Sequence, residues 1–318
     1  MKNKISLLMA FIFIFQAVSV QAAIWPFAKK EKKKLTEARA EYAVQNYHGA
    51  ISKLKEFLVE GTVKRREVRA YILLGDCYEK IGALDSALNT YLEAVEMHPK
   101  NKQLLLKLGA LYQRTDLIQN STQIYQRVLE IAPENEEALL GLARAYMSEG
   151  FFSKAEEFYQ KYFRTNAKNK TKIYQEYAFC YYRQRNYNAA LLYVALFMEK
   201  EGESFDGLFL AAAISRQMGH KAEAYEFIDK AIALQGKPQG TVVKALWNVQ
   251  DGEYSLALSL AQEAFKEDSD NQLALYIQYL CYKGLGKPRE AKKQLEAIAA
   301  FEQENFISRV AALKLNQL

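Results

Sequence analysis

Apolar and small residues recur along this chain in two series that share a period of 34. The first series places a leucine beside a small residue and a tyrosine three positions later, in Leu74-Gly75-x-x-Tyr78, Leu108-Gly109-x-x-Tyr112 and Leu142-Ala143-x-x-Tyr146. Residues at i, i+1 and i+4 share one face of an α-helix, so each group predicts a helix with a buried stripe. The second series predicts another helix in each period through a small residue and a tyrosine: Ala87 and Tyr91, Ser121 and Tyr125, Ala155 and Tyr159.

Small residues extend both series along most of the chain. The first-helix positions are Ala38, Gly75, Gly109, Ala143, Ala178, Ala212 and Ala245. The second-helix positions are Ala50, Ala87, Ser121, Ala155, Ala190, Ala224, Ala257 and Ala291. Both series contain the same irregular spacings. Glycines that permit a turn lie between the two helices of a pair, at Gly82, Gly150, Gly219, Gly252 and Gly286. Each period is therefore expected to be a helix-turn-helix unit.

This pattern resembles the tetratricopeptide repeat, a unit of two helices with the same period. Residues 68–101 and 102–135 match it nearly throughout. The first and the last three units are degenerate, with Glu41, Ser215 and Asn248 in place of the first-helix tyrosine and Tyr279 in place of a small residue. The resemblance implies an all-α, right-handed α-solenoid of about eight tandem repeats. The alternative is an unrelated helical bundle, which requires no such period.

The spacing predicts these boundaries: repeats at about 31–64, 68–101, 102–135, 136–169, 171–204, 205–237, 238–271 and 272–305. A C-terminal capping helix is expected over 306–318, where Val310, Leu313 and Leu315 would cover the last exposed face.

Residues 1–22 have the pattern of a secretory signal peptide. Lys2 and Lys4 precede the apolar run 5–15, and cleavage is expected between Ala22 and Ala23. The alternative is that the segment is retained as a membrane anchor. No cysteine lies near the cut, so a lipoprotein is excluded, and we expect a periplasmic or secreted protein. A basic leader follows at 23–34. Its segment 25–34 combines aromatic residues with lysines, which suits either a membrane-surface contact or a solvated leader.

Composition and charge narrow the class of activity. The chain has 318 residues, of which half are apolar and a quarter are charged, with a formal net charge of +6. The charge is well mixed beyond the basic leader, so no nucleic-acid partner is expected. The three histidines are isolated, and no nucleotide-binding loop or nucleophile elbow occurs. We therefore expect no enzyme, catalytic residue, cofactor or metal site.

The three cysteines occupy the same place in repeats two, five and eight. The spacings between Cys77, Cys180 and Cys281 are 103 and 101. Three repeats correspond to roughly 30 Å at about 10 Å per helix layer, whereas a disulfide requires Cα atoms within about 7 Å. The cysteines are expected to be buried and unbridged.

In the resembled family, five places of each repeat face a concave groove. Carried onto this sequence, they include ten basic residues: Lys32, Arg39, Arg69, Lys80, Arg114, Arg144, Lys172, Arg183, Arg216 and Lys283. Only four are acidic: Asp76, Glu79, Glu137 and Asp206. Aromatic residues gather in the central repeats, and Tyr42 and Tyr276 lie near the ends. The residues predicted to bind a partner are Arg144, Phe179, Tyr182, Arg183, Phe209 and Arg216.

These features predict an exported, non-enzymatic scaffold or adaptor that binds other proteins through an acidic or extended peptide segment. A role in cell-envelope assembly is expected from the predicted export. Two specialised sites of the family, the chaperone-tail clamp and the asparagine ladder, are absent from the corresponding positions. The alternatives are a membrane-anchored adaptor with an uncleaved N-terminal helix, and an accessory subunit of an envelope enzyme that binds cell-wall glycan or peptide.

Overall fold

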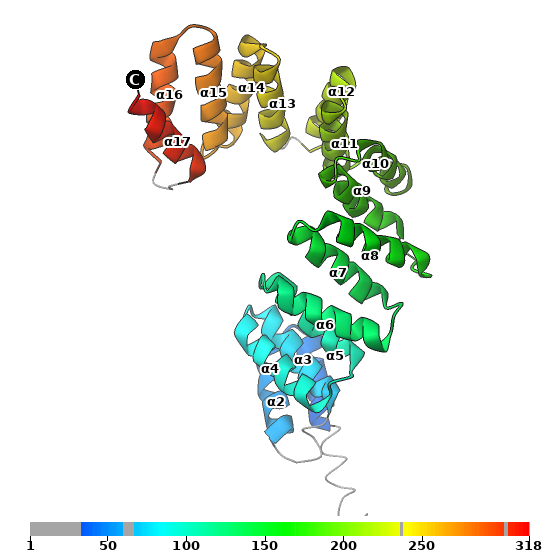
Figure 1. Ribbon diagram of the computed structural model, residues 1–318. Helices are drawn as coiled ribbons and strands as arrows, with labels where there is room; N and C mark the ends of the chain where they lie inside the picture. The colour runs from blue at the N-terminus through cyan, green and yellow to red at the C-terminus, as the bar shows by residue number, and fades with distance from the viewer. Residues whose placement is uncertain (1–32, 60–66, 169, 236–237, 302–304, 318) are drawn as a thin grey trace, which may run out of the picture. The chain divides into compact units, whose positions relative to one another are not determined.

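The computed structural model describes residues 33–59, 67–168, 170–235, 238–301 and 305–317 (Figure 1). The predicted signal peptide, its cleavage site at Ala22 and Ala23, and the leader up to residue 32 lie outside these residues. The described part of the chain contains α-helices joined by turns and one short 3-10 helix, and no strand. These helices confirm the predicted all-α repeat solenoid. The chain divides into two compact units, Met1–Ala167 and Lys168–Leu318.

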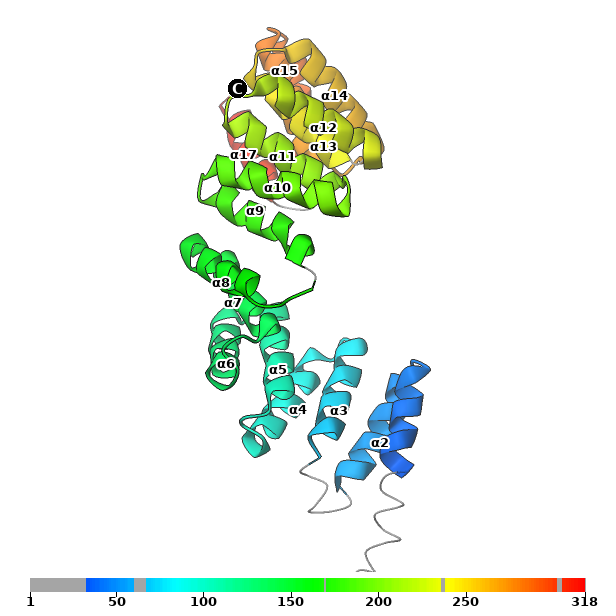
Figure 2. The ribbon, with the colours of Figure 1, turned by 90° about the vertical axis from the view of Figure 1, so that its right-hand side faces the viewer.

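The first unit consists of helix pairs whose partners follow each other along the chain. A helix over 33–43 is followed by α2 (Tyr47–Val59), α3 (Val68–Lys80), α4 (Leu84–Met97), α5 (Lys102–Arg114), α6 (Ile118–Ile131), α7 (Glu136–Ser148) and α8 (Phe152–Arg164). Within this unit, α3 packs on α4, α5 on α6 and α7 on α8 (Figure 2). The repeat boundaries given above stay predictions.

The second unit continues the same alternation. A 3-10 helix, Lys170–Ile173, precedes α9 (Tyr174–Arg183), α10 (Tyr187–Glu201), α11 (Phe205–Gln217), α12 (Lys221–Gln235), α13 (Pro238–Gln250), α14 (Tyr254–Glu267), α15 (Gln272–Gly284), α16 (Pro288–Ala299) and α17 (Phe306–Leu315). No described helix is both long enough and apolar enough to cross a membrane.

Side-chain caps and left-handed turn residues set the ends of the helices. Caps that accept a hydrogen bond from a backbone N–H of the first helical turn include Asn46, Asn101, Asn135, Asn186, Ser204, Asn271 and Asn305. Between paired helices, the predicted glycines have positive φ, for example 76° at Gly82 and 85° at Gly252. Three other pairs place Gln45, Asp116 or Arg185 in the same conformation at φ near 60°, so the turn geometry holds where glycine is absent.

The tyrosines of the second helices form the core of the first unit. Tyr91, Tyr125 and Tyr159 are almost fully buried. The ring of Tyr125 packs between two glycines, because a Cβ atom at Gly109 or at Gly141 would lie 2.9 or 2.3 Å from its nearest ring atom. The period shared by the small residues and the tyrosines therefore reflects contacts within a repeat and with the next one.

The last helix differs in detail from its prediction. α17 packs through Ile307, Ala311 and Leu315 against the cluster that contains Leu275 and Leu295. Leu313, which the sequence predicts to cover the last face, is 64% exposed. The face that is buried follows the i, i+4, i+8 positions starting at Ile307, and Leu313 lies outside that stripe.

The cysteines agree with their prediction. Cys77, Cys180 and Cys281 are buried, and no disulfide joins them in the part of the chain that the structure describes. Burial raises the pKa of the Cys77 and Cys281 thiols to about 11, and the charge of Asp76 contributes at Cys77. Thiols with such values are poor nucleophiles near neutral pH, so these cysteines serve as small apolar residues.

Candidate functional site

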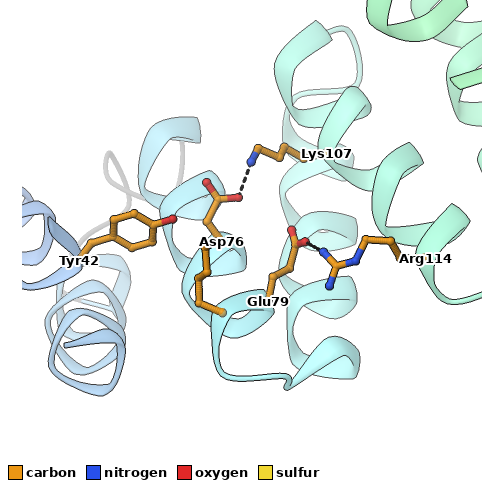
Figure 3. Close-up of a pocket in the computed structure, with 6 residues that line it drawn as sticks. Tyr42, Asp76, Glu79, Lys107 and Arg114 are labelled. Atoms are coloured by element: carbon orange, nitrogen blue, oxygen red, sulfur yellow. Dashed lines mark hydrogen bonds and ion pairs between the residues drawn. The ribbon is translucent and has the colours of Figure 1, made fainter. Parts of the chain in front are cut away.

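The first unit contains a cavity of about 470 Å³ beside the first helices of its first three pairs (Figure 3). Its lining comes from the helix over 33–43, from α3 and from α5: Tyr42, Asp76, Glu79, Lys80, Lys107 and Arg114. The members on α3 lie at i, i+3 and i+4, and those on α5 are two helical turns apart, so each helix presents one face to the cavity. We call it the Lys107–Arg114 cavity.

Five of the six lining residues are positions that the family resemblance assigned to the concave groove. Lys107 is the exception, because it occupies a place that the resemblance did not assign to groove contacts. From the sequence, the other charges contribute only to a net total, and the predicted binding cluster lies in the central repeats. Neither Lys107 nor the pairing of these charges across adjacent repeats was predicted.

Two ion pairs connect α3 to α5 across the cavity. Lys107 Nζ lies 2.8 Å from Asp76 Oδ1, and Arg114 Nη1 donates a hydrogen bond to Glu79 Oε2. The side chains of Lys107 and Arg114 are 39% and 53% exposed, whereas those of Asp76 and Glu79 are 20% and 16% exposed. The two carboxylates are thus largely shielded from solvent, whereas the two cations are more accessible to a ligand from outside.

The hydroxyl of a buried tyrosine lies within hydrogen-bond distance of both carboxylates. The hydroxyl of Tyr91, on α4, lies 2.8 Å from Asp76 Oδ1 and 2.8 Å from Glu79 Oε1. A phenol has a single proton, so the hydroxyl donates to one of the two carboxylates at a time. Burial raises the pKa of Tyr91 far above its ordinary value, and Asp76 and Glu79 raise it further. The hydroxyl therefore stays protonated and is always available as a donor.

The cavity keeps a small positive charge at neutral pH. Burial lowers the pKa of Lys107, but its hydrogen bond to Asp76 and the nearby negative charges outweigh this effect, so the net pKa is raised. Burial and the charge of Asp76 raise the pKa of Tyr42, which stays neutral. Lys80, Lys107 and Arg114 then face two carboxylates. Among the described residues, no group of acidic, histidine or cysteine side chains could hold a metal ion.

The structure brings three of the predicted partner-binding residues together on α9. The rings of Phe179 and Tyr182 stack with their centres 6.2 Å apart, and the guanidinium carbon of Arg183 lies 5.7 Å from the centre of the Phe179 ring. Phe179 is 39% exposed, Arg183 is exposed and Tyr182 is half-buried. These residues form a small aromatic surface with a cation at its edge.

The two predicted residues on α11 are engaged inside the second unit. Phe209 stacks on Phe205 at 5.7 Å between ring centres and packs against buried side chains. Arg216 Nη1 and Nη2 donate to Asp251 Oδ2 and Oδ1 at 2.8 and 3.0 Å. Its guanidinium carbon also lies 5.5 Å from the Trp247 ring centre. Asp251 thus supplies from within the chain the carboxylate that Arg216 was expected to bind in a partner.

Arg144, the remaining predicted residue, lies on α7 in the first unit and is exposed. The other five belong to the second unit. Partner binding by these six residues stays a prediction. Tyr91 was predicted only as a packing residue and Asp251 was not predicted at all, yet each takes part in several polar contacts.

Comparison with known proteins identifies the repeats. Residues 35–102 and 118–171 match two models described as tetratricopeptide repeat. A stretch of 64 residues is 41% identical to anaphase-promoting complex subunit 3 of Dictyostelium discoideum, and it covers 20% of this chain but only 6% of that protein.

Two solved structures share the fold at low identity. A tetratricopeptide repeat protein from Parabacteroides merdae is 18% identical with a TM-score of 0.63, covering 79% of this chain and 98% of its own. PilF of Pseudomonas aeruginosa is 17% identical with a TM-score of 0.54, covering 65% of this chain and 92% of its own. The matched repeats, the helix pairs and the shared fold agree. The chain contains tetratricopeptide repeats, over residues 35–102 and 118–171.

Proposed function

We propose that this chain binds an acidic, extended segment of a partner protein in the Lys107–Arg114 cavity. The tetratricopeptide repeat fold is that of a protein–protein interaction scaffold, and repeat proteins of this kind are generally not catalytic. The observation that carries the proposal is the arrangement of charges around the cavity, in which shielded carboxylates hold more exposed cations in place.

The cations retain hydrogen-bonding capacity beyond their contacts within the chain. An ammonium group has three N–H donors and a guanidinium group has five. The contacts of Lys107 with Asp76 and of Arg114 with Glu79 use one donor each. The remaining donors can bind the carboxylates of a partner, and Tyr42 adds an aromatic surface at the edge of the same cavity.

An acidic ligand suits this lining better than a basic one. A basic side chain would have to displace Lys107 or Arg114 from carboxylates that the same chain holds beside them. An acidic side chain can add to the exposed side of the cations without breaking either ion pair. Charge complementarity of this kind also accelerates association and makes it sensitive to salt.

The test compares two pairs of substitutions that remove the same charge. Binding of a fluorescein-labelled, glutamate-rich peptide would be followed by anisotropy for the wild type, for Lys107→Gln/Arg114→Gln and for Lys154→Gln/Lys161→Gln. The control lysines have the same separation in sequence, on the exposed side of α8. We expect about a tenfold weaker affinity for the first pair, equivalent to about 1.4 kcal/mol, and little change for the second.

Two results would contradict the proposal. One is a wild-type protein that fails to bind the acidic peptide at low salt. The other is an equal loss for both pairs, which would indicate attraction by net charge alone. A lysine-rich peptide of the same length serves as the probe for the opposite charge preference, and it should bind more weakly than the glutamate-rich one.

We also propose that the chain is exported and serves as a scaffold in the cell envelope. The support is the sequence of residues 1–22, with two lysines, an apolar run and small residues at Ala22 and Ala23. Amino-terminal sequencing of the protein from its native cells would test this. A mature chain that begins at Ala23 supports export with cleavage, whereas a chain that keeps residues 1–22 supports a retained anchor or no export.

A further inference from the structure

The hydroxyl of Tyr91 distinguishes this residue from its counterpart one repeat later. Tyr91 and Tyr125 occupy equivalent places in successive repeats, both are buried, and both rings pack against a glycine of the preceding helix. Only the hydroxyl of Tyr91 has a carboxylate within hydrogen-bond distance; among the described residues Tyr125 has none. The ring position is thus explained by packing, but the polar contacts of Tyr91 require a separate explanation.

Lys107 and Arg114 both connect to this one oxygen atom through a carboxylate. Lys107 contacts Asp76, which lies 2.8 Å from the Tyr91 hydroxyl, and Arg114 contacts Glu79, which lies at the same distance. Each cation is therefore two polar contacts away from a buried, fixed phenol. Long cationic side chains have many rotamers in solution, so a fixed anchor of this kind restricts where their charges lie.

We propose that Tyr91 is a positioning residue that sets the spacing between the Lys107 and Arg114 charges and thereby the spacing of acidic groups that the cavity accepts. This inference rests on the proposed function. The phenol itself contacts no ligand, because its side chain is fully buried. It acts through Asp76 and Glu79, which it holds in one arrangement on α3. Pre-oriented donors bind a matching ligand more tightly because less side-chain entropy is lost on binding.

The single phenolic proton also couples the two halves of the site. When a ligand draws Lys107 away from Asp76, that carboxylate gains most from the proton of Tyr91, and Glu79 then loses it. The contributions of Lys107 and Arg114 to binding should therefore depend on each other in the wild type. Without the hydroxyl, the two cations should act independently.

The binding experiment uses Tyr91→Phe with Tyr125→Phe as the matched control, because each removes one hydroxyl from a buried tyrosine and keeps the ring. The probes are Gly/Ser peptides with two glutamates placed two, three or four positions apart. We expect the wild type and Tyr125→Phe to prefer one spacing by more than about fivefold, and Tyr91→Phe to discriminate by less than about twofold. Unchanged discrimination in Tyr91→Phe, or an equal loss in both variants, would overturn the inference.

Coupling supplies a readout that a purely structural role would not change. In the wild-type background, the loss of affinity in the Lys107→Gln/Arg114→Gln double variant should differ by at least about threefold from the product of the losses in the two single variants. The same two substitutions should be multiplicative in Tyr91→Phe. Glu79→Gln tests the relay from the carboxylate side, and it should remove the spacing preference as Tyr91→Phe does; if the preference persists, the relay is wrong.

A measurement without any ligand separates this inference from the proposed function. Nuclear magnetic resonance can follow rotation about the Cζ–Nε bond of Arg114 in the full chain. We expect rotation several-fold faster in Tyr91→Phe than in the wild type and Tyr125→Phe. If the rates are equal, Tyr91 does not position Arg114. If the rates differ but no acidic peptide binds the wild type, the positioning role stands and the proposed ligand is wrong.

Discussion

Gly75 lies directly against the ring of Tyr91, so that a Cβ atom at Gly75 would be 2.1 Å from Tyr91 Cε1. Gly75 is on α3 and Tyr91 is on α4, and no side chain larger than hydrogen fits between the two helices at this point. The contact brings the Tyr91 hydroxyl to Asp76 and Glu79, which are one and four residues after the glycine. The close approach of α3 and α4 at this point therefore determines a core contact and also the position of the two carboxylates that line the cavity.

Gly75→Ala should destabilise the protein although alanine favours helix. The added methyl group must push the Tyr91 ring aside, and overpacking of this kind typically costs about 1–3 kcal/mol. Gly109→Ala is the comparison, because its Cβ would lie 2.9 Å from the Tyr125 ring and requires a smaller displacement than the 2.1 Å contact at Gly75. Urea unfolding followed by circular dichroism should give a lower midpoint for Gly75→Ala than for Gly109→Ala. Equal midpoints would contradict this account of the contact.

Asp251→Asn should lower the free energy of unfolding by about 2 kcal/mol, because it weakens charge-assisted hydrogen bonds in a partly buried network. Asp251 accepts from Arg216, from Lys221 and from Tyr225. Glu226→Gln is the control, since Glu226 pairs with Lys230 in solvent, and it should have no measurable effect. Thermal and urea unfolding would measure both. A comparable, negligible effect of the two variants would show that the Asp251 network adds no stability.

The same network should weaken in acid. Hydrogen bonds from Arg216 and Lys221 hold the pKa of the Asp251 carboxyl well below its usual range. A carboxyl group with a lowered pKa in the folded state stabilises the fold above its unfolded pKa of about 3.9, and this contribution is lost as the pH falls below that value. The difference in unfolding free energy between wild type and Asp251→Asn should thus be constant from neutral pH to about 5 and shrink below 4. A constant difference down to lower pH would contradict the assignment.

Phe179→Ala/Arg183→Ala should weaken partner binding and leave stability nearly unchanged, because both side chains are exposed on α9. Phe209→Ala should instead cost roughly 3 kcal/mol of stability, since the ring packs on Phe205 and its neighbours. Co-precipitation from native cells followed by mass spectrometry would measure binding, and thermal unfolding would measure stability. If the α9 double variant recovers the same partners as the wild type, this surface is not used.

The thiols should react only after unfolding. With a pKa of about 11, only about one in a thousand of the Cys77 or Cys281 thiols is ionised at pH 8, and both are buried. Alkylation of the native protein at that pH should be slow, whereas denaturation without a reductant should expose three thiols per chain. Fewer than three thiols after denaturation would reveal a disulfide and would contradict the structure.

The order of the helices could be predicted from the sequence alone because the contacts that define them are local and repeated. A small residue and a turn return along the chain with the same period, joined by a tyrosine in the middle repeats, and the small residues and tyrosines pack within their own repeat or against the next one. Helix periodicity then identifies the buried stripe of each helix without knowledge of distant residues. The burial of the three cysteines followed from the same register. Leu313 was predicted to be buried but is exposed. A terminal helix has a neighbour on one side only, so it can rotate about its axis and bury a different stripe of residues.

Only the tertiary structure decided which charges meet. Asp76 and Glu79 find their cations on the next first helix, at Lys107 and Arg114, and Arg216 finds Asp251 in the turn after α13. Many positions of the repeats carry charged residues, so the sequence alone allows many alternative ion pairs and favours none of them. The choice among them depends on the side-chain reach and the separation of neighbouring helices, which is a property of the packed core and not of the sequence period. The period therefore determined the scaffold, and the packing of adjacent repeats determined the site.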